Sequence, residues 1–309
     1  MKRLVPLLVA VLLVVGCGQS YEEKQRIIRT QQRQLMREDS AALKIAVLPT
    51  LDCLPLFVAA ERRFFSEGGA DVRLKMFTAQ MDCDTAIMGG SVEGTITDLV
   101  RAERMQRLGM PLSYMTKTNT YWQLYANRMA RIRKLSQLND KMLAMTRYSA
   151  TDLLADFVAD SAKQAPERLF KIQVNDVHIR LKMLIGNEID AVLLTEPQAT
   201  QARLARHTRL LDSRQERMQL GVIAFTEKVV ADTARQHQLD VFRKAYNQAC
   251  DSLTRYGIGS YRDIVEKYCQ MPPNQIDSLP GDLKFTKMAE PLKADVERAR
   301  QWIDKQPQL

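Results

Sequence analysis

Polar side chains that could hold a small solute follow the ends of several predicted strands. Carboxylates accept hydrogen bonds from amines, hydroxyls donate or accept them, and N–H groups at a helix start attract anions. The sequence offers no convincing pair of nucleophile and base, so we expect binding and no enzymatic activity. The candidate ligand-binding residues are Thr50, Asp52, Thr97, Asp98, Trp122, Tyr148, Ser149, Thr151 and Glu196.

Several of these residues also suit purely structural roles. Ser149 or Thr151 can cap the helix that begins there, and the same helix start offers N–H groups to an anion. Asp52 can cap the following helix or accept a hydrogen bond from a ligand amine. Glu196 precedes Pro197, and proline is favoured at the first position of a helix. The sequence leaves these alternatives open.

Four aromatic residues cluster where the chain is expected to cross between two lobes. They are Tyr114, Tyr121, Trp122 and Tyr125, in a chain with 6% aromatic residues and only two tryptophans. Such a cluster could form a wall on which a flat heterocycle stacks, or it could be ordinary core.

Predicted strands and helices alternate from Lys44 onward, which is typical of an α/β fold with mostly parallel sheets. We assign residues 44–125 to the first part of lobe 1, residues 126–215 to lobe 2, and residues 216–309 to a return to lobe 1 plus C-terminal helices. In open α/β sheets, ligands bind beyond the carboxyl ends of the strands. The candidate residues are therefore expected to face a cleft between the two lobes.

An ordered series of short motifs resembles a known family of proteins. The series reads PTLDCLPLFVAAERRFFSEGGADVRLKMF, GGSVEGTITDLVRA and GNEIDAVLLTEPQA. It resembles solute-binding proteins of the type II periplasmic fold, in the branch that binds sulfonates, nitrate, taurine or thiamine-precursor pyrimidines. Glu93 stands where that family often has aspartate. The resemblance covers roughly residues 44–226.

The resemblance implies two lobes, each with a mixed, mostly parallel sheet flanked by helices, joined by crossing hinge strands. It also implies a small solute in the cleft, an ABC importer permease as partner, no cofactor, and Glu196 facing the cleft. The acids Asp52, Asp98 and Glu196 favour a ligand with N–H donors, such as a pyrimidine. The helix start at Ser149, with Arg147 nearby, favours a sulfonate or other organic anion.

Two other functions remain open at this point. Related two-lobed folds host pyrimidine- and menaquinone-pathway enzymes, but those act in the cytoplasm. The iron-site cysteine motif of the pyrimidine synthases is also missing. A surface lipoprotein that kept the fold without a transport ligand is the other alternative, and it predicts no stabilisation by any small molecule.

The first 17 residues are typical of a bacterial lipoprotein signal. Lys2 and Arg3 precede an apolar run of 12 residues that is too short to span a bilayer as a stable helix. The run ends in a sequence that resembles a lipobox, so we expect cleavage after residue 16 and lipid on Cys17. The protein is then exported and anchored to a bacterial membrane, facing the periplasm or the cell surface.

Residues 17–42 are predicted to form a polar tether between the lipid and the folded domain. The net charge of +9 comes from arginine and lysine scattered among acids. Because this charge forms no long basic run and the protein is exported, we expect no nucleic-acid partner.

Four cysteines remain once Cys17 is assigned to lipid, namely Cys53, Cys83, Cys250 and Cys269. Export to an oxidising compartment allows two disulfides, and local pairing favours 53–83 with 250–269. Four free, buried thiols are the alternative. The spacing of the cysteines does not fit a zinc site, so no metal is expected.

Replacing Cys17 tests the predicted anchor. In a bacterial host, Cys17→Ser should abolish incorporation of radiolabelled palmitate and move the protein out of the membrane fraction. The variant Cys53→Ser is the matched control and should keep both label and membrane attachment. Palmitate labelling that survives Cys17→Ser would contradict the lipobox assignment.

Overall fold

The computed structural model describes residues 21–163 and 168–307, in two compact units. The first unit, residues 1–42, contains the polar helix α2 (Tyr21–Ala41) over most of the predicted tether. The second unit, residues 43–309, contains everything else. The predicted signal peptide and Cys17 lie outside the described residues.

The sheet of lobe 1 has five strands in the order β2-β1-β3-β10-β4. Strand β1 runs parallel to β2 and β3, whereas β10 is antiparallel to β3 and β4. Every residue of β1 and β3 is buried, as expected for central strands covered on both faces. The strands are β1 (Leu43–Val47), β2 (Val72–Met76), β3 (Gly94–Asp98), β4 (Leu112–Lys117) and β10 (Gly221–Thr226).

The sheet of lobe 2 repeats this arrangement in the order β7-β6-β8-β5-β9. Strand β6 is parallel to β7 and β8, and β5 is antiparallel to β8 and β9. In each lobe, therefore, a strand that arrives from the other lobe is inserted antiparallel in fourth place. The strands are β5 (Gln123–Ala126), β6 (Lys141–Met145), β7 (Leu169–Gln173), β8 (Ala191–Leu194) and β9 (Thr208–Asp212).

The chain crosses between the lobes over residues 118–122 and again over residues 213–220. Because β5 pairs only with strands of lobe 2, residues 123–125 belong to that lobe. Hydrogen bonds tie the two crossings together: the Trp122 N–H donates to Ser213 Oγ at 3.0 Å, and the Ser213 N–H donates to Trp122 O at 2.9 Å.

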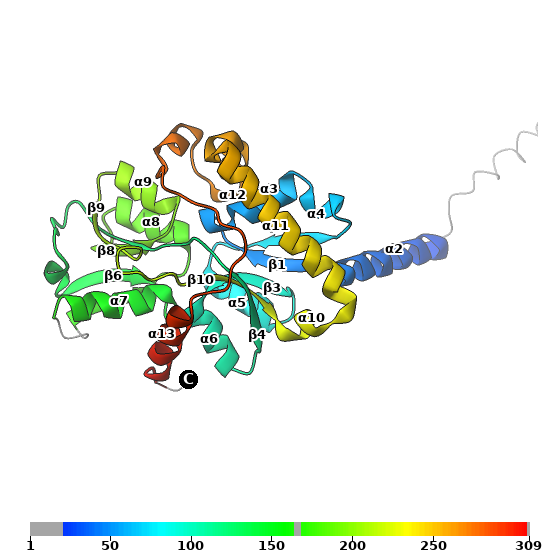
Figure 1. Cartoon of the computed structure of the whole chain (residues 1–309), viewed down its shortest axis with the longest axis horizontal. Coiled ribbons are helices and arrows are strands. Elements are labelled where there is room, and N and C mark those ends of the chain that lie inside the picture. The colour runs from blue at the N-terminus through cyan, green and yellow to red at the C-terminus, as the bar shows by residue number, and fades with distance from the viewer. Residues whose placement is uncertain (1–20, 164–167, 308–309) are drawn as a thin grey trace, which may run out of the picture. The chain divides into compact units, whose positions relative to one another are not determined.

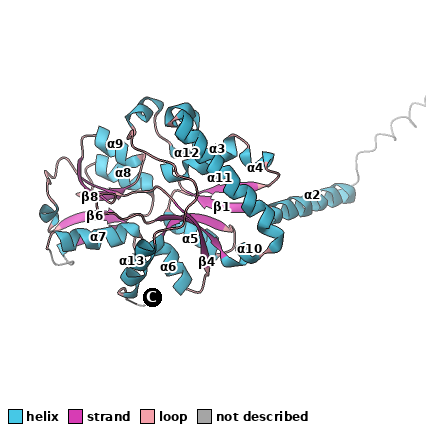
Figure 2. Ribbon diagram, viewed as in Figure 1, coloured by secondary structure: helices cyan, strands magenta, loops and turns pink. Residues whose placement is uncertain are grey.

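Helices flank both sheets (Figures 1 and 2). In lobe 1 they are α3 (Leu54–Glu61), α4 (Phe64–Glu67), α5 (Gln80–Met88), α6 (Leu99–Arg107), α10 (Glu227–Ala231), α11 (Gln236–Tyr256) and α12 (Arg262–Cys269). In lobe 2 they are α7 (Ala150–Ser161), α8 (Val177–Ile185) and α9 (Gln198–Leu204). Short 3₁₀ turns are η1 (Leu51–Cys53), η2 (Leu135–Leu138), η4 (Thr233–Arg235), η5 (Ile258–Tyr261) and η6 (Pro273–Ser278).

The last helix, α13 (Lys293–Asp304), packs on α6 of lobe 1 and on α7 of lobe 2. Its residues Ala299 and Ile303 share one apolar cluster with Leu99 and Val100 of α6 and with Leu154 of α7. The segment that leads to α13 runs from the α12 region past β4 (orange to red in Figure 1). The two lobes therefore share a continuous apolar seam on the side of α6, α7 and α13.

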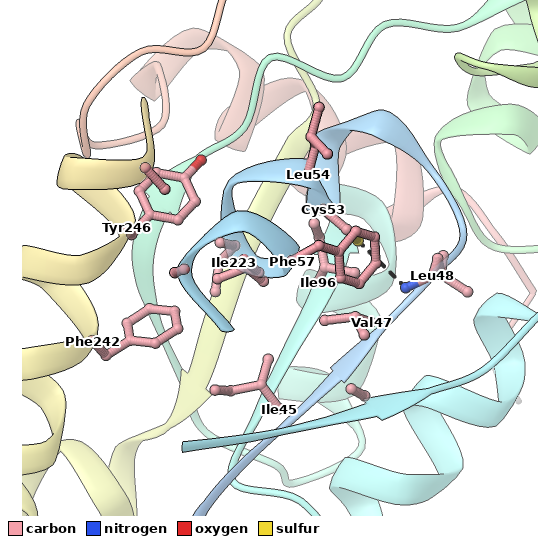
Figure 3. Packing of buried hydrophobic residues seen from close by; sticks show 14 of the residues in the cluster. Ile45, Val47, Leu48, Cys53, Leu54, Phe57, Ile96, Ile223, Phe242 and Tyr246 are labelled. Carbon is pink, nitrogen blue, oxygen red and sulfur yellow. Dashed lines mark hydrogen bonds between the residues drawn. The ribbon is translucent and has the colours of Figure 1, made fainter. Parts of the chain in front are cut away.

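The predicted disulfides 53–83 and 250–269 are absent: all four cysteines of the second unit are free and buried. All four cysteines belong to one apolar cluster, and Cys53 Sγ accepts a hydrogen bond from the Leu48 N–H at 3.3 Å (Figure 3). Burial raises the pKa of all four thiols, which favours the unreactive protonated form. The pairing expected from nearness in sequence is therefore wrong, and the alternative of four free, buried thiols holds.

Gly94 of β3 packs so closely against β10 that no side chain fits at this position. A Cβ at position 94 would lie 2.6 Å from the ring of Phe225, which is fully buried. Gly94→Ala should therefore lower the free energy of unfolding by about 1–3 kcal/mol, measured by urea denaturation. Gly259→Ala is the control, because a Cβ there meets nothing within 4 Å. Equal stability of the two variants would contradict the close packing of β3 on β10.

Candidate functional site

A cavity of about 50 Å³ lies between the two lobes, at the carboxyl ends of the central strands. Lobe 1, lobe 2 and the first crossing all contribute to its wall. The lining residues are Leu48, Thr50, Asp52, Gln80, Ile96, Thr97, Thr120, Trp122, Val177, Arg180, Leu193, Leu194, Thr195 and Gln198.

Hydrogen bonds between the lobes close this cavity from two sides. On one side the Leu51 N–H donates to Glu196 O at 2.9 Å, and Gln198 Nε2 donates to Pro49 O at 3.1 Å. On the other side the Val177 N–H donates to Thr78 O at 3.2 Å. The structure is therefore a closed arrangement of the lobes.

Arg180 is the only charged residue of the lobe 2 wall. It lies on α8 and is 6% exposed, with its Nη1 donating to Leu193 O at 2.8 Å. Its Nε has no hydrogen-bond partner, and no carboxylate among the described residues forms an ion pair with it. Burial lowers the pKa of Arg180 to about 10, with Asp176 opposing that shift. The side chain is still protonated at neutral pH, so the lobe 2 wall of the cavity carries a positive charge that no ion pair among the described residues neutralises.

Asp52 faces the same cavity from lobe 1, on the turn η1. Burial raises the pKa of its carboxyl above the usual value, and the hydroxyls of Thr120 and Thr50 oppose that increase. The N-cap position of α3 is occupied by Cys53 and not by Asp52. Asp52 therefore does not take the N-cap position of the helix, which the sequence had left open.

A further polar atom at this wall lacks a partner. Gln198 is fully buried and its Oε1 accepts no hydrogen bond. Buried polar groups are normally satisfied, and exceptions need an explanation. Arg180 Nε and Gln198 Oε1 therefore present a donor and an acceptor to whatever fills the cavity.

Of the four aromatic residues that could have formed a wall, only Trp122 lines this cavity. Trp122 is 8% exposed. Tyr121 instead contacts the guanidinium of Arg214, which lies 3.7 Å from its ring centroid. Tyr125 is 1% exposed in the lobe 2 core, and the Tyr114 hydroxyl donates to Glu103 Oε1 at 2.8 Å.

Glu196 lines a smaller neighbouring cavity of about 20 Å³, whose wall also contains Asp52 and Thr120. Its Oε1 accepts from Gln123 Nε2 at 3.0 Å and from the Tyr121 hydroxyl at 3.3 Å. Its Oε2 accepts from the Thr200 N–H at 3.0 Å. The carboxylate therefore holds the first crossing to the start of α9.

Asp98, Tyr148, Ser149 and Thr151 do not line the cavity. Asp98 Oδ1 accepts from the N–H groups of Arg101 and Ala150, both at 3.0 Å, so it occupies the start of α7. Ser149 caps α7 by accepting from the Thr151 N–H. Tyr148 packs under Arg104, whose guanidinium lies 5.0 Å from its ring centroid. Of the candidates, Thr50, Asp52, Thr97 and Trp122 come together at the cavity wall.

Sequence reasoning missed Arg180 and Gln198. Arg180 stands between Val177 and Leu184, three and four residues away, and therefore lies on the buried face of α8. A lone charge on an apolar helix face is the signal that could have identified it. Gln198 has no comparable signal, because its burial depends on contact with the other lobe.

Comparison with solved structures shows the fold. The alkanesulfonate-binding protein SsuA from Xanthomonas axonopodis pv. citri, solved bound to MOPS, aligns with a TM-score of 0.71 at 18% identity over 85% of this chain and 90% of that one. The periplasmic nitrate-binding protein NrtA from Synechocystis PCC 6803 aligns with a TM-score of 0.67 at 14% identity, over 81% and 72%. A Candida albicans protein with the generic periplasmic binding protein fold aligns with a TM-score of 0.66 at 11% identity, over 85% and 89%.

The chain has the two-lobed periplasmic binding fold. The predicted α/β architecture and the resemblance to this group of structures are thereby confirmed. By sequence, no family model and no curated protein matches the chain. Across residues 21–163 and 168–307, no helix is both long and apolar enough to cross a membrane, and no group of three metal-binding side chains is found.

The role of Glu196 in holding the first crossing to α9 can be tested by measuring the free energy of unfolding. Glu196→Ala leaves three donors without their carboxylate and should lower the free energy of unfolding by about 2–3 kcal/mol in urea denaturation. The exposed Glu216→Ala is the control and should change stability by less than about 0.5 kcal/mol. A Glu196→Ala variant as stable as this control would show that the three hydrogen bonds do not hold the crossing.

Proposed function

We propose that the protein captures a small anionic solute in the cavity between its lobes and delivers it to an ABC importer. The observation that carries this proposal is the buried guanidinium of Arg180 at the cavity wall, with an unpaired Nε and no carboxylate partner. A buried charge without a partner is costly, and an oxyanion would supply the missing charge and accept hydrogen bonds.

The size of the cavity limits the solute. About 50 Å³ holds about three to five water molecules, since one water needs about 10–15 Å³ on this measure. An inorganic oxyanion or a short organic sulfonate or carboxylate fits that space better than an aminopyrimidine ring. Of the two ligand classes that the sequence left open, the anion is therefore favoured over the pyrimidine.

A second polar contact comes from Asp52 on the opposite wall. When its carboxyl is charged it can accept a hydrogen bond from an ammonium or amide of the solute, and when protonated it can donate one to an oxyanion. Thr50 and Thr97 add hydroxyls on the same side. A solute with an anionic end at Arg180 and a polar end at Asp52 satisfies both walls.

The two-lobed architecture suits capture of a solute by closure of the lobes around it. Two crossings join the lobes, and periplasmic binding proteins close around a ligand by a hinge motion at such crossings. Two of the similar structures are of an alkanesulfonate-binding protein and a nitrate-binding protein, and alkanesulfonates and nitrate are small oxyanions. Lipid on Cys17 and a tether over residues 17–42 would hold the domain near a membrane importer.

Binding of anions by the purified full chain in detergent tests the proposal. We expect nitrate, short sulfonates or short carboxylates to bind in isothermal titration calorimetry, and a ligand at one hundred times its Kd to add about 2.7 kcal/mol of stability. Arg180→Gln should weaken binding at least tenfold. Arg217→Gln, which removes an exposed arginine outside the cavity, should leave affinity unchanged.

Two results would contradict the proposal. If no anion in the panel binds a well-folded protein, the surface lipoprotein without a transport ligand becomes the better description. If an anion binds wild type and Arg180→Gln equally, the solute lies elsewhere.

A further inference from the structure

The seam between the lobes contains a carboxyl group that hydrogen-bonds to both of them. Asp98 ends β3 and caps α6 in lobe 1 by accepting from the Arg101 N–H at 3.0 Å. The same oxygen, Oδ1, accepts from the Ala150 N–H of α7 in lobe 2, also at 3.0 Å. Asp98 is 4% exposed. One buried carboxyl oxygen thus joins the N-termini of two helices that belong to different lobes.

The contact is reinforced from Arg101, whose Nη1 donates to Arg147 O at 3.3 Å across the same seam. Arg101 also forms a buried ion pair with Asp84 on α5. The positive ends of both helix dipoles point at Asp98, and N–H groups of this kind bind anions. Asp98 therefore takes the place at the start of α7 that an anionic solute could otherwise occupy.

We propose that Asp98 latches the two lobes together, and that protonation of its carboxyl favours the closed arrangement. This inference rests on the proposed function in one respect, which is that the lobes open and close. Opening would separate Asp98 from Ala150 and expose the carboxyl to water, whereas closing buries it. Burial disfavours the charged form of a carboxyl, so closing and proton uptake are linked.

The charged groups around Asp98 fix the direction of the effect. Burial raises its pKa to about 7 in the closed structure; Arg101 and the two N–H groups oppose that rise, and Asp84 adds to it. Further charged groups near this seam are Arg104 on α6, Arg147 beside α7, Asp152 in the first turn of α7, and Arg180 on α8. Asp152 is already paired with Lys171.

The pKa of Asp98 is higher in the closed arrangement than in an open one. In an open state the pKa of Asp98 returns toward about 4, the usual value for aspartate. The closed state, with the higher pKa, is then favoured below pH 7 and loses that advantage as the pH rises through 7. Between pH 6 and pH 8 the closing equilibrium should fall about tenfold.

Hydrogen exchange of the Ala150 amide measures the latch directly and needs no solute. In the full chain in detergent, protection of this amide, corrected for intrinsic exchange, should fall about tenfold from pH 6 to pH 8. Asp98→Asn keeps the acceptor oxygen but cannot titrate, so protection should stay within about twofold over the same range. The control is Asp295→Asn, at a buried carboxyl that accepts a hydrogen bond from the Gln219 N–H and none from α7, and it should retain the wild-type response.

A second variant covers the case in which Asp98→Asn does not fold. Asp98→Ser keeps a residue that can cap α6 but withdraws the carboxyl from Ala150, so the Ala150 amide should exchange fast at both pH values. Unchanged pH dependence in Asp98→Asn, or full protection in Asp98→Ser, would overturn the latch. Because the readout uses no ligand, a protein that binds no anion but shows these responses would contradict the proposed function alone.

Discussion

Burial of charge at the seam between the lobes is the constraint on which the rest of the structure depends. Closing the lobes removes water from Arg180, Asp98 and Arg101, and each charge must then find a partner inside the protein or in a ligand. Arg101 has Asp84, and Asp98 has two backbone N–H groups. Arg180 has only a carbonyl oxygen on one of its nitrogens. The missing charge partner of this one side chain is the basis of the proposed binding of an anion.

The two lobes could be predicted from the sequence because local patterns determine them. Short apolar runs alternate with helical stretches, and the strand–helix order alone implies parallel sheets with ligand contacts at the strand ends. Thr50, Asp52 and Thr97 follow that rule and reach the cavity, whereas Trp122 reaches it from the first crossing, just before β5. The exact crossing could not be predicted, since residues 121–127 read as a strand equally suited to either sheet, and only pairing with β8 and β9 assigns them.

Features that depend on contact between lobes could not be predicted. The helix start at Ser149 looks like an anion site in sequence, but the structure fills it with Asp98, which is 52 residues away from its partner Ala150. The cysteines illustrate the same limit, because nearness in sequence favoured 53–83 and 250–269 while core packing leaves all four thiols free. Arg180 differs from these cases, because its place on the apolar face of α8 follows from helical spacing in the sequence.

A crystal of the protein grown in a bromide salt gives the most direct test of the central claim. The account predicts an anomalous difference peak for bromide in contact with the Arg180 guanidinium, inside the cavity between the lobes. Ordered bromide only at surface arginines, with water or nothing beside Arg180, would contradict it.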